Sequence, residues 1–439
     1  MNKRRALVVL ALAIVVAVSI GLWRSAQPIK GNVLVLMLDT LRADHLGAYG
    51  YQRATSPNID HFAQENVRFS YTVTAAPWTP PSVASMFTGV YPATHGWMPP
   101  NIRKDVKEAA IKLDDKLVTL AEIFQANGYS TVAVSPNPWI SEDFGYQQGF
   151  ETFVFRERAP AEKIVKIGEA QIDRLLKEDK PFFMYLHFLD PHDPYSAPDS
   201  YKNAFTDAVP GKQYPPRVLK NINHYDGEIK YMDAQIGRLF SYLKEQGLYD
   251  DLTIILVADH GEQFMEHGQH GHGHQLFNEE VHVPLIVKSP KVLGARVVNI
   301  TTSTIDVFPT ALDAAGIKVP QGIPGVSLLN DTEIEFRQGV FTEIERVFKQ
   351  KAFTTPDGLK LIKQINPDQS EIVIGVFDHN KDDSEINPIK DQEIIATMSN
   401  ELSEINRYAL EGRIEGSDSA RGQLKDATIE QLKTLGYLQ

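Results

Sequence analysis

Runs of apolar residues recur along the chain, and each run has the length of one β-strand. Most lack polar alternation, which is typical of strands buried on both faces of a parallel sheet. The predicted strands are residues 33–38, 129–135, 182–188, 253–257 and 283–287, and the predicted helices are residues 57–65, 117–127, 159–176, 225–246 and 305–315. This alternation predicts an α/β fold, with a mostly parallel central sheet and helices on both faces.

The pattern changes beyond about residue 345. Three short segments predict a small antiparallel sheet, and a periodic stretch after them predicts a helix. These elements are residues 351–355, 359–364, 371–377 and 392–410, with a closing helix at residues 428–435. We therefore expect a main domain at residues 30–345 and a C-terminal subdomain at residues 346–439.

The N-terminus begins with basic residues and continues with an uncharged apolar run at residues 6–23. At about 1.5 Å per residue this run is just long enough to cross a bilayer. Residues 1–28 are therefore expected to form a single-pass membrane anchor, with the body of the protein extracytoplasmic (periplasmic). The alternative is a cleaved signal peptide and a secreted protein.

Charge and cysteine content exclude several classes of protein. The formal net charge is -12 and no basic stripe offsets it, which argues against a nucleic-acid partner. The chain has no cysteine, so disulfides, thiolate metal sites and cysteine nucleophiles are excluded.

One short helix is predicted to begin at a hydroxyl. In residues 79–89, Thr79 has the character of an N-cap, Pro80 suits the first helical position and Gly89 suits the C-cap. The free N–H groups and the dipole of such a helix attract an anion. By itself, Thr79 could be a cap and nothing more.

Three predicted strands end in potential ligands. Asp39, the pair Asp190 and His192, and the pair Asp259 and His260 follow these strands. Parallel strands place their carboxyl ends at one edge of the sheet, where such folds bind ligands. Oxygen and imidazole donors without sulfur suit a divalent cation.

We therefore expect one cation to contact Asp39, Asp259, His260 and the Thr79 oxygen. Coordination would lower the pKa of the Thr79 hydroxyl and make it a nucleophile. A second metal site is left open, with Asp190 as a conceivable ligand.

A histidine- and glycine-rich stretch follows at residues 266–274. It could be a flexible polar loop, but it lies a few residues beyond Asp259. We therefore expect His272 or His274 to hold substrate oxyanions or to protonate a leaving alkoxide.

Together these motifs resemble the sulfatase family of the alkaline phosphatase superfamily. The resemblance is strong over about residues 30–345 and loose beyond them. It is carried by residues 32–50, 79–89, 91–96, 190–195, 225–228, 259–262 and 432–438. Sulfatases carry a cysteine or serine, matured to formylglycine, in a C/S-x-P-x-R frame. Here Thr79 occupies the nucleophile position and Val83 replaces the arginine.

Because threonine cannot become formylglycine, the resemblance is closest to the phosphodiesterase, phosphoethanolamine-transferase and lipoteichoic-acid-synthase branches, which form a covalent phosphothreonine. Thr40 and Asn137 also depart from the sulfatase pattern and weaken the case for its calcium site. Asp259-His260 in place of Asp-Asn favours Zn²⁺ or Mn²⁺, with Ca²⁺ or Mg²⁺ possible.

The resemblance also implies roles for residues around the nucleophile. His192 is expected to bind oxygens of the transferred group, and His274 to lie near the position of the sulfate-binding lysine, with His272 as its rival. Asn137 and Trp78 are further candidates for substrate binding.

The sequence thus predicts a metal-dependent hydrolase or transferase that acts on phosphate or sulfate esters through Thr79. Its substrate would be a small-molecule, lipid-headgroup or glycan ester, selected by loops at residues 101–116 and 198–224. The alternatives are a genuine sulfuric ester hydrolase without formylglycine, or a catalytically silent protein that binds an anion or glycan.

Overall fold

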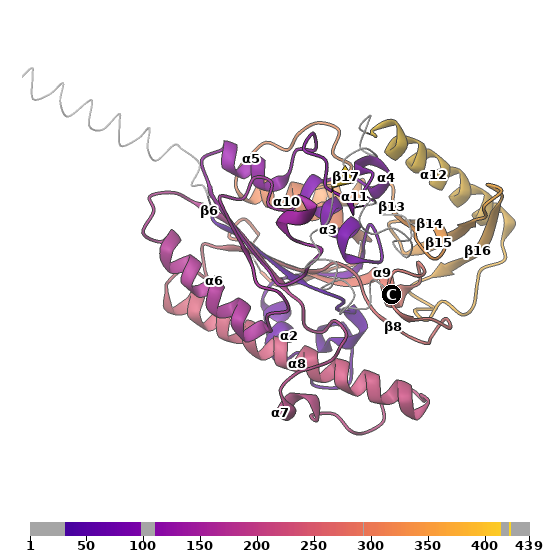
Figure 1. Ribbon diagram of the computed structural model, residues 1–439. Coiled ribbons are helices and arrows are strands. Elements are labelled where there is room, and N and C mark those ends of the chain that lie inside the picture. The colour runs from indigo at the N-terminus through magenta and orange to yellow at the C-terminus, as the bar shows by residue number, and fades with distance from the viewer. Residues whose placement is uncertain (1–30, 98–109, 293, 414–420, 423–439) are drawn as a thin grey trace, which may run out of the picture.

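The computed structural model describes residues 31–97, 110–292, 294–413 and 421–422. Figure 1 shows a large central sheet between two layers of helices, with a smaller sheet and a long helix to one side. The predicted α/β fold is confirmed, including the small antiparallel sheet and helix near the C-terminus.

Within the described part of the chain, the central sheet has nine strands, and β10 is the one that runs antiparallel to its neighbours. The strand order is β11-β2-β10-β7-β1-β6-β4-β5, and β12 also pairs with β2. The strands are β1 (Val33–Leu38), β2 (Val67–Val73), β4 (Ser130–Ser135), β5 (Thr152–Phe155), β6 (Phe182–Phe188), β7 (Thr253–Ala258), β10 (His282–Lys288), β11 (Arg296–Val298) and β12 (Thr302–Ser303). All six residues of the central strand β1 are buried, as its unbroken apolar run predicted.

Alternate side chains of β1 enter two separate cores. Val33, Val35 and Met37 pack with α3, α5 and α10, whereas Leu34 and Leu36 pack on the other face with α2, α6 and α8. The helices are α2 (Pro57–Glu65), α3 (Thr79–Thr88), α5 (Leu120–Ala126), α6 (Ala161–Leu175), α8 (Pro216–Glu245) and α10 (Val307–Ala314). Burial on both faces fixes the sheet as the rigid support for residues at its strand ends.

Local signals explain where two of the helices begin. α5 begins three residues later than predicted because Thr119 caps it and Glu122 completes a capping box. In α3, Trp78 is the N-cap, so the prediction that Thr79 is the cap is wrong. Gly89 ends α3 in the left-handed conformation as predicted, with a φ of 72°.

The C-terminal sheet has four strands rather than the three predicted. They are β13 (Val340–Glu345), β14 (Lys349–Thr354), β15 (Leu359–Ile365) and β16 (Glu371–Asp378), all antiparallel, and α12 (Gln392–Glu411) packs on this sheet. β13 lies before the predicted domain boundary, and its backbone also bonds to the loop before α3, because Glu343 N–H donates to the Ala75 carbonyl (3.1 Å). This sheet therefore contacts the segment that leads into Thr79.

Shorter elements connect these layers. They are η1 (Ala43–His45), η2 (Gly47–Tyr49), α4 (Pro92–His95), β3 (Ala110–Ile111), η3 (Glu142–Phe144), α7 (Asp199–Lys202), β8 (Gln263–Phe264), β9 (His270–Gly271), α9 (Asn278–Val281), η4 (Thr304–Asp306), α11 (Asp331–Glu335) and β17 (Arg421–Gly422).

The predicted N-terminal membrane anchor needs correction. Among the described helices, none is long and apolar enough to cross a membrane. The two longest, α8 with 30 residues and α12 with 20, carry many charged side chains. The segment at residues 6–23 lies outside the described residues, as does the predicted helix at residues 428–435. The single-pass anchor, the membrane as a partner and the extracytoplasmic location inferred from it are withdrawn.

Candidate active site

Strand register brings the two predicted carboxylates together. In the pairing of β1 with β7, Leu38 lies opposite Ala258, so the next residues, Asp39 and Asp259, leave neighbouring strands side by side. Both carboxylates are fully buried. Two adjacent buried carboxylates repel each other unless a proton or a cation lies between them.

The hydroxyl of Thr79 faces the imidazole of His260. Thr79 Oγ1 lies 3.1 Å from His260 Nε2, and both residues are fully buried. The other ring nitrogen, Nδ1, lies 2.9 Å from the Gly261 carbonyl. Because a carbonyl only accepts hydrogen bonds, Nδ1 is assigned the hydrogen and Nε2 a lone pair that points at Thr79. Burial lowers the pKa of His260 to about 4, so the ring is neutral near pH 7.

Thr79, Asp39 and Asp259, the other three residues predicted to share a cation with His260, surround His260 Nε2. His260 Nε2 lies 3.8 Å from Asp39 Oδ1 and 3.5 Å from Asp259 Oδ2. These two carboxylate oxygens are buried and have no hydrogen-bond partner. Buried carboxylate oxygens without partners are costly, and a divalent cation would satisfy both. The donor set therefore fits a metal ion.

The ionisation of the two carboxylates is unequal. Burial opposes ionisation of Asp39, but the hydrogen bond and the charge of His187 lower its pKa to about 2. Burial and the charge of Asp39 raise the pKa of Asp259 well above its usual value. Negative charge is therefore favoured on Asp39 and a proton on Asp259, and a bound cation would compete with that proton.

The second oxygen of Asp39 is held by two donors. Asn137 Nδ2 donates to Asp39 Oδ2 at 2.6 Å, and His187 Nε2 contacts the same oxygen at 2.9 Å. Tyr185 OH lies 2.8 Å from His187 Nδ1 and orients the ring. The described contact of the Asn137 amide is therefore with Asp39, and Asn137 is fully buried. Its predicted contact with substrate stays a prediction.

His187 was missed by the sequence reasoning. It is a polar residue inside an otherwise apolar strand, and it pairs with Met37, two residues before Asp39 on β1. Asp39, His187 and Asp259 each offer a ligand atom within 4.8 Å of the others. The histidine within the run was the available signal, because a buried imidazole needs a polar partner.

Two further histidines line the side of His260. The ring centroids of His260 and His272 lie 4.4 Å apart, and those of His272 and His192 lie 5.0 Å apart. Between the rivals His272 and His274, the described contacts place His272 beside His260. His274 donates its backbone N–H to Glu280 (3.0 Å).

A hollow of about 320 Å³ adjoins His192 and is also lined by Arg158, Asp190 and Glu228. Asp190 faces this hollow rather than the cation ligands, and it accepts a hydrogen bond from Ala161 N–H (3.0 Å). The hollow provides space for a substrate group next to His192.

An arginine from the C-terminal sheet also approaches the site. Arg346, in the turn between β13 and β14, places its Cζ 4.9 Å from the ring centre of Trp78, and its Nη1 donates to the His272 carbonyl (3.4 Å). Trp78 is itself buried between Trp97 and Trp139. Arg346 had no sequence signal, because only tertiary packing brings it beside the residue that precedes Thr79.

The motif at residues 225–228 supports the loop that follows Asp39. Tyr225 OH donates to the Thr40 carbonyl (2.7 Å) and accepts from Arg42 N–H (2.9 Å). The fully buried carboxylate of Asp226 contacts His45 Nδ1 and Arg53 Nη1, each at 2.7 Å. These contacts fasten the start of the loop to α8.

The fold and the site define an alkaline phosphatase-like α/β protein with a buried cluster of carboxylates, imidazole and hydroxyl at its strand ends. The family described as Sulfatase matches residues 31–317, more than half of the chain, so the chain belongs to the sulfatase family. The family described as N-sulphoglucosamine sulphohydrolase, C-terminal, matches residues 266–408.

Curated relatives are similar over long stretches. The ulvan-active sulfatase of Formosa agariphila is 25% identical over 69% of this chain, and the match spans 65% of that relative's own length. The arylsulfatase of Clostridium perfringens is 25% identical over 92% of this chain and 99% of its own.

Solved structures share the fold. The structure of yidJ from Bacteroides fragilis superposes with a TM-score of 0.74 at 17% identity, covering 89% of this chain and 97% of its own. The phosphonate monoester hydrolase of Agrobacterium radiobacter has a TM-score of 0.69 at 19% identity, covering 87% and 96%.

Proposed function

We propose that this chain hydrolyses sulfate esters with the hydroxyl of Thr79 as its nucleophile, in place of formylglycine. The observation that carries the proposal is the 3.1 Å contact between Thr79 Oγ1 and His260 Nε2, beside the unpartnered oxygens of Asp39 and Asp259. A hydroxyl held against a neutral imidazole and two carboxylates has the surroundings of an activated nucleophile.

Asp39, Asp259 and His260 would hold a divalent cation, with the Thr79 oxygen as a further ligand. When bound, such a cation lowers the pKa of the hydroxyl and neutralises charge on the ester oxygens. Zn²⁺ or Mn²⁺ suits this mixed oxygen and nitrogen set, and Ca²⁺ is the other candidate in this family.

In the proposed reaction, the Thr79 hydroxyl gives its proton to water, and its oxygen forms a bond to the sulfur of the ester. The bond from sulfur to the ester oxygen breaks, and that oxygen leaves as an alcohol after receiving a proton. Water then attacks the same sulfur, which releases sulfate and restores the hydroxyl. The N-terminal end of α3, where the helix dipole is positive, lies at Thr79, beside the region where negative charge develops.

His192 and His272 are the candidates that bind the oxyanion and protonate the leaving oxygen. Both retain slight exposure whereas Thr79 is fully buried, so the substrate would approach from their side. The hollow next to His192 would take the alcohol part of the ester. His274 and Trp78 remain further candidates for this lining.

Hydrolysis of phosphate diesters is a second candidate, and one observation favours it. A threonine cannot provide the two hydroxyls of hydrated formylglycine, so the covalent intermediate must be released by attack of water on the central atom. A phosphothreonine intermediate is ordinarily released in this way, by attack of water on phosphorus. Transfer to an acceptor alcohol would follow the same course with the alcohol in place of water.

The test compares Thr79→Val with the wild type on an aryl sulfate, a phosphate monoester, a phosphate diester and a phosphonate ester. Valine keeps the shape of threonine and removes the oxygen, so we expect turnover to fall by at least about 10³-fold on whichever ester is cleaved. Mass spectrometry of acid-quenched wild-type enzyme should detect a sulfo or phospho group on the peptide that contains Thr79.

Thr88→Val is the matched control. Thr88 lies at the other end of α3, and its hydroxyl donates to the Ala84 carbonyl (2.7 Å) within the helix. It should keep wild-type turnover. If Thr79→Val retains activity while folded, the nucleophile is another group and the proposal fails. If the protein binds these esters without turnover, it is the silent member of the family.

A further inference from the structure

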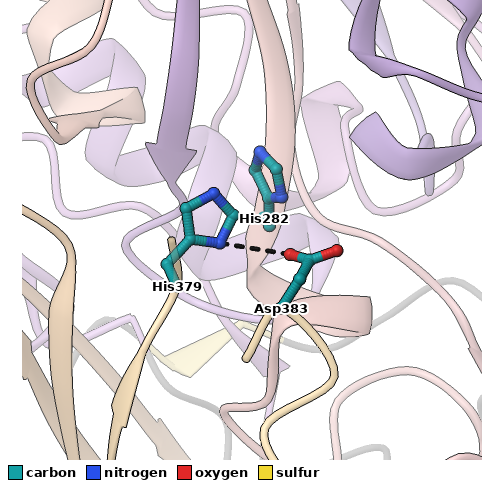
Figure 2. A group of neighbouring side chains, drawn as sticks. All are labelled: His282, His379 and Asp383. Atoms are coloured by element: carbon teal, nitrogen blue, oxygen red, sulfur yellow. Dashed lines mark ion pairs between the residues drawn. The ribbon is translucent and has the colours of Figure 1, made fainter. Parts of the chain in front are cut away.

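A second group of ligand-type side chains lies where the central sheet meets the C-terminal sheet. Figure 2 shows His282, His379 and Asp383 gathered at one point. His282 begins β10 of the central sheet, whereas His379 and Asp383 follow β16. Each offers one ligand atom, and the three atoms lie within 4.8 Å of one another. None of the three is used by the candidate active site.

His282 is held by its surroundings in one tautomer. Its Nε2 lies 3.2 Å from the Ser70 carbonyl, which can only accept, so Nε2 is assigned the hydrogen. Its Nδ1 then carries the lone pair that a metal ion needs. A histidine ligand characteristically donates its other N–H to a carbonyl or carboxylate in this way. The ring is also buried.

His379 is fixed by stacking. Its ring lies parallel to that of Tyr71, with centroids 3.7 Å apart and an angle of 8° between the planes. The ring of His282 meets it edge-on at 5.0 Å. Tyr71 OH also donates to Asn278 Oδ1 (2.9 Å), which fastens the stacking partner itself. The two imidazoles are therefore positioned before any ligand arrives.

Asp383 completes the group from the surface. Its Oδ1 lies 3.1 Å from His379 Nδ1, and its side chain is 59% exposed. Two ligand atoms of one tetrahedral zinc ion lie roughly 3.3 Å apart, given metal–ligand distances near 2 Å. The spacing of Asp383 and His379 is therefore close to that of two ligands, and His282 would move inward slightly to join them.

We propose that His282, His379 and Asp383 bind a divalent transition-metal ion of the Zn²⁺ class, distinct from the catalytic cation. Two imidazoles and one carboxylate suit Zn²⁺ and lack the six to eight oxygens that Ca²⁺ takes. The exposure of Asp383 leaves a fourth position for water and a route for the ion from solvent.

The position of the group indicates what the ion does. A buried apolar cluster that includes Tyr71 joins β2 of the central sheet and α9, the helix directly before His282, to β13, β14, β15 and β16. An ion bound by His282 on one sheet and by His379 and Asp383 on the other would link the two sheets across this seam through coordination bonds. It acts as a structural clip between the sheet that carries Asp39 and Asp259 and the sheet that carries Arg346.

The test measures zinc binding and thermal unfolding of full-length protein stripped with a chelator. Asp383→Asn and His379→Gln should each bind one zinc ion fewer per chain than the wild type in equilibrium dialysis. Saturating Zn²⁺, at about 100 times its Kd at the clip, should raise the Tm of the wild type by about 3 °C more than that of either variant. Co²⁺ in the wild type should show the visible absorption of a tetrahedral site, weakened in both variants.

His61→Gln and Glu65→Gln are the matched controls. His61 Nε2 lies 3.4 Å from Glu65 Oε1 four residues later, the same sequence spacing as in His379 and Asp383. Both control residues are exposed on α2, and their variants should bind as much zinc as the wild type.

The clip is refuted if Asp383→Asn and His379→Gln bind as many zinc ions as the wild type, or if the control variants lose the same ion. Turnover of the candidate ester substrate should persist in Asp383→Asn supplied with metal, because Asp383 is not part of the active site. If the proposed function is wrong, folded Thr79→Val will keep its turnover. Thr79→Val should still bind zinc at the clip, because Thr79 is not part of it.

Discussion

Removal of the Asn137 side chain should weaken metal binding at the candidate active site. Asn137 Nδ2 donates to Asp39 Oδ2 at 2.6 Å, and this bond leaves Asp39 Oδ1 turned toward His260. In Asn137→Ala, His187 becomes the remaining side-chain donor to that oxygen. The carboxylate is then free to rotate, and its free oxygen is no longer held in place for a cation.

Two separate estimates give the same size of effect. A hydrogen bond to a charged group contributes about 1.5–3 kcal/mol. Loss of a group that orients a metal ligand costs about 10–100-fold in metal affinity, which corresponds to about 1.4–2.8 kcal/mol. We therefore expect Asn137→Ala to weaken the affinity for the catalytic cation by roughly 10–100-fold.

The affinity is measured by competition with a chromophoric chelator, using Zn²⁺ and Mn²⁺ in turn. Asp383→Asn serves as the background, so that metal at the proposed clip does not contribute to the signal. Asn127→Ala is the matched control, because Asn127 Nδ2 also donates a hydrogen bond, to the Ile123 carbonyl (2.8 Å), but at an exposed helix end. It should leave the affinity unchanged.

A folded Asn137→Ala protein whose metal affinity stays within about twofold of its background would contradict this reasoning. Asp39 would then be oriented by His187 alone. If turnover fell while metal affinity did not, Asn137 would act on substrate, as the sequence first indicated.

Two further predictions concern positions around the site. Burial lowers the pKa of His95 to about 3 from 6.5, so His95 contributes stability above pH 6.5 that is lost as the pH falls toward 3, by up to about 5 kcal/mol. The urea midpoint of His95→Gln should therefore change less between pH 7 and 4 than that of the wild type. An equal change of the midpoint in both proteins would exclude His95 as a source of this pH dependence. A Cβ at Gly261 would lie 2.1 Å from the Glu279 carbonyl oxygen, so Gly261→Ala should displace the neighbouring His260 and lower turnover at least about tenfold. Gly31→Ala is the control, because the nearest atom to its Cβ would be the Ala314 carbonyl oxygen at 3.7 Å, and it should keep turnover; unchanged kinetics in Gly261→Ala would show that the backbone shifts to accept the methyl group.

Much of the fold could be predicted from the chain because its signals are local. The buried strands were visible as apolar runs, since a strand covered on both faces has few positions for polar residues. Helix limits depend on caps, and α5 begins at Leu120 rather than at the predicted residue 117 because Thr119 and Glu122 form a capping box. The antiparallel direction of β10 had no local signal, because an apolar run reads the same in either direction.

The candidate site divides in the same way. Asp39, Asp259 and His260 could be named in advance because each directly follows a predicted buried strand. His187 and Arg346 could not, because each owes its place to a neighbour far away in the sequence. The side of the sheet that His187 faces depends on its register with β1, and register is a property of the assembled sheet.

The sequence by itself predicted five of the nine strands of the central sheet, the absence of thiol chemistry and a hydroxyl at the start of a short helix. The tertiary structure decided that Thr79 faces a nitrogen rather than caps its helix, that His272 lies beside His260, and that two histidines and an aspartate meet across the seam between the sheets. The physical reason is that composition and periodicity act between near neighbours. Distances between ligand atoms instead depend on how whole layers pack, and that packing is the sum of many contacts that no single stretch of sequence contains.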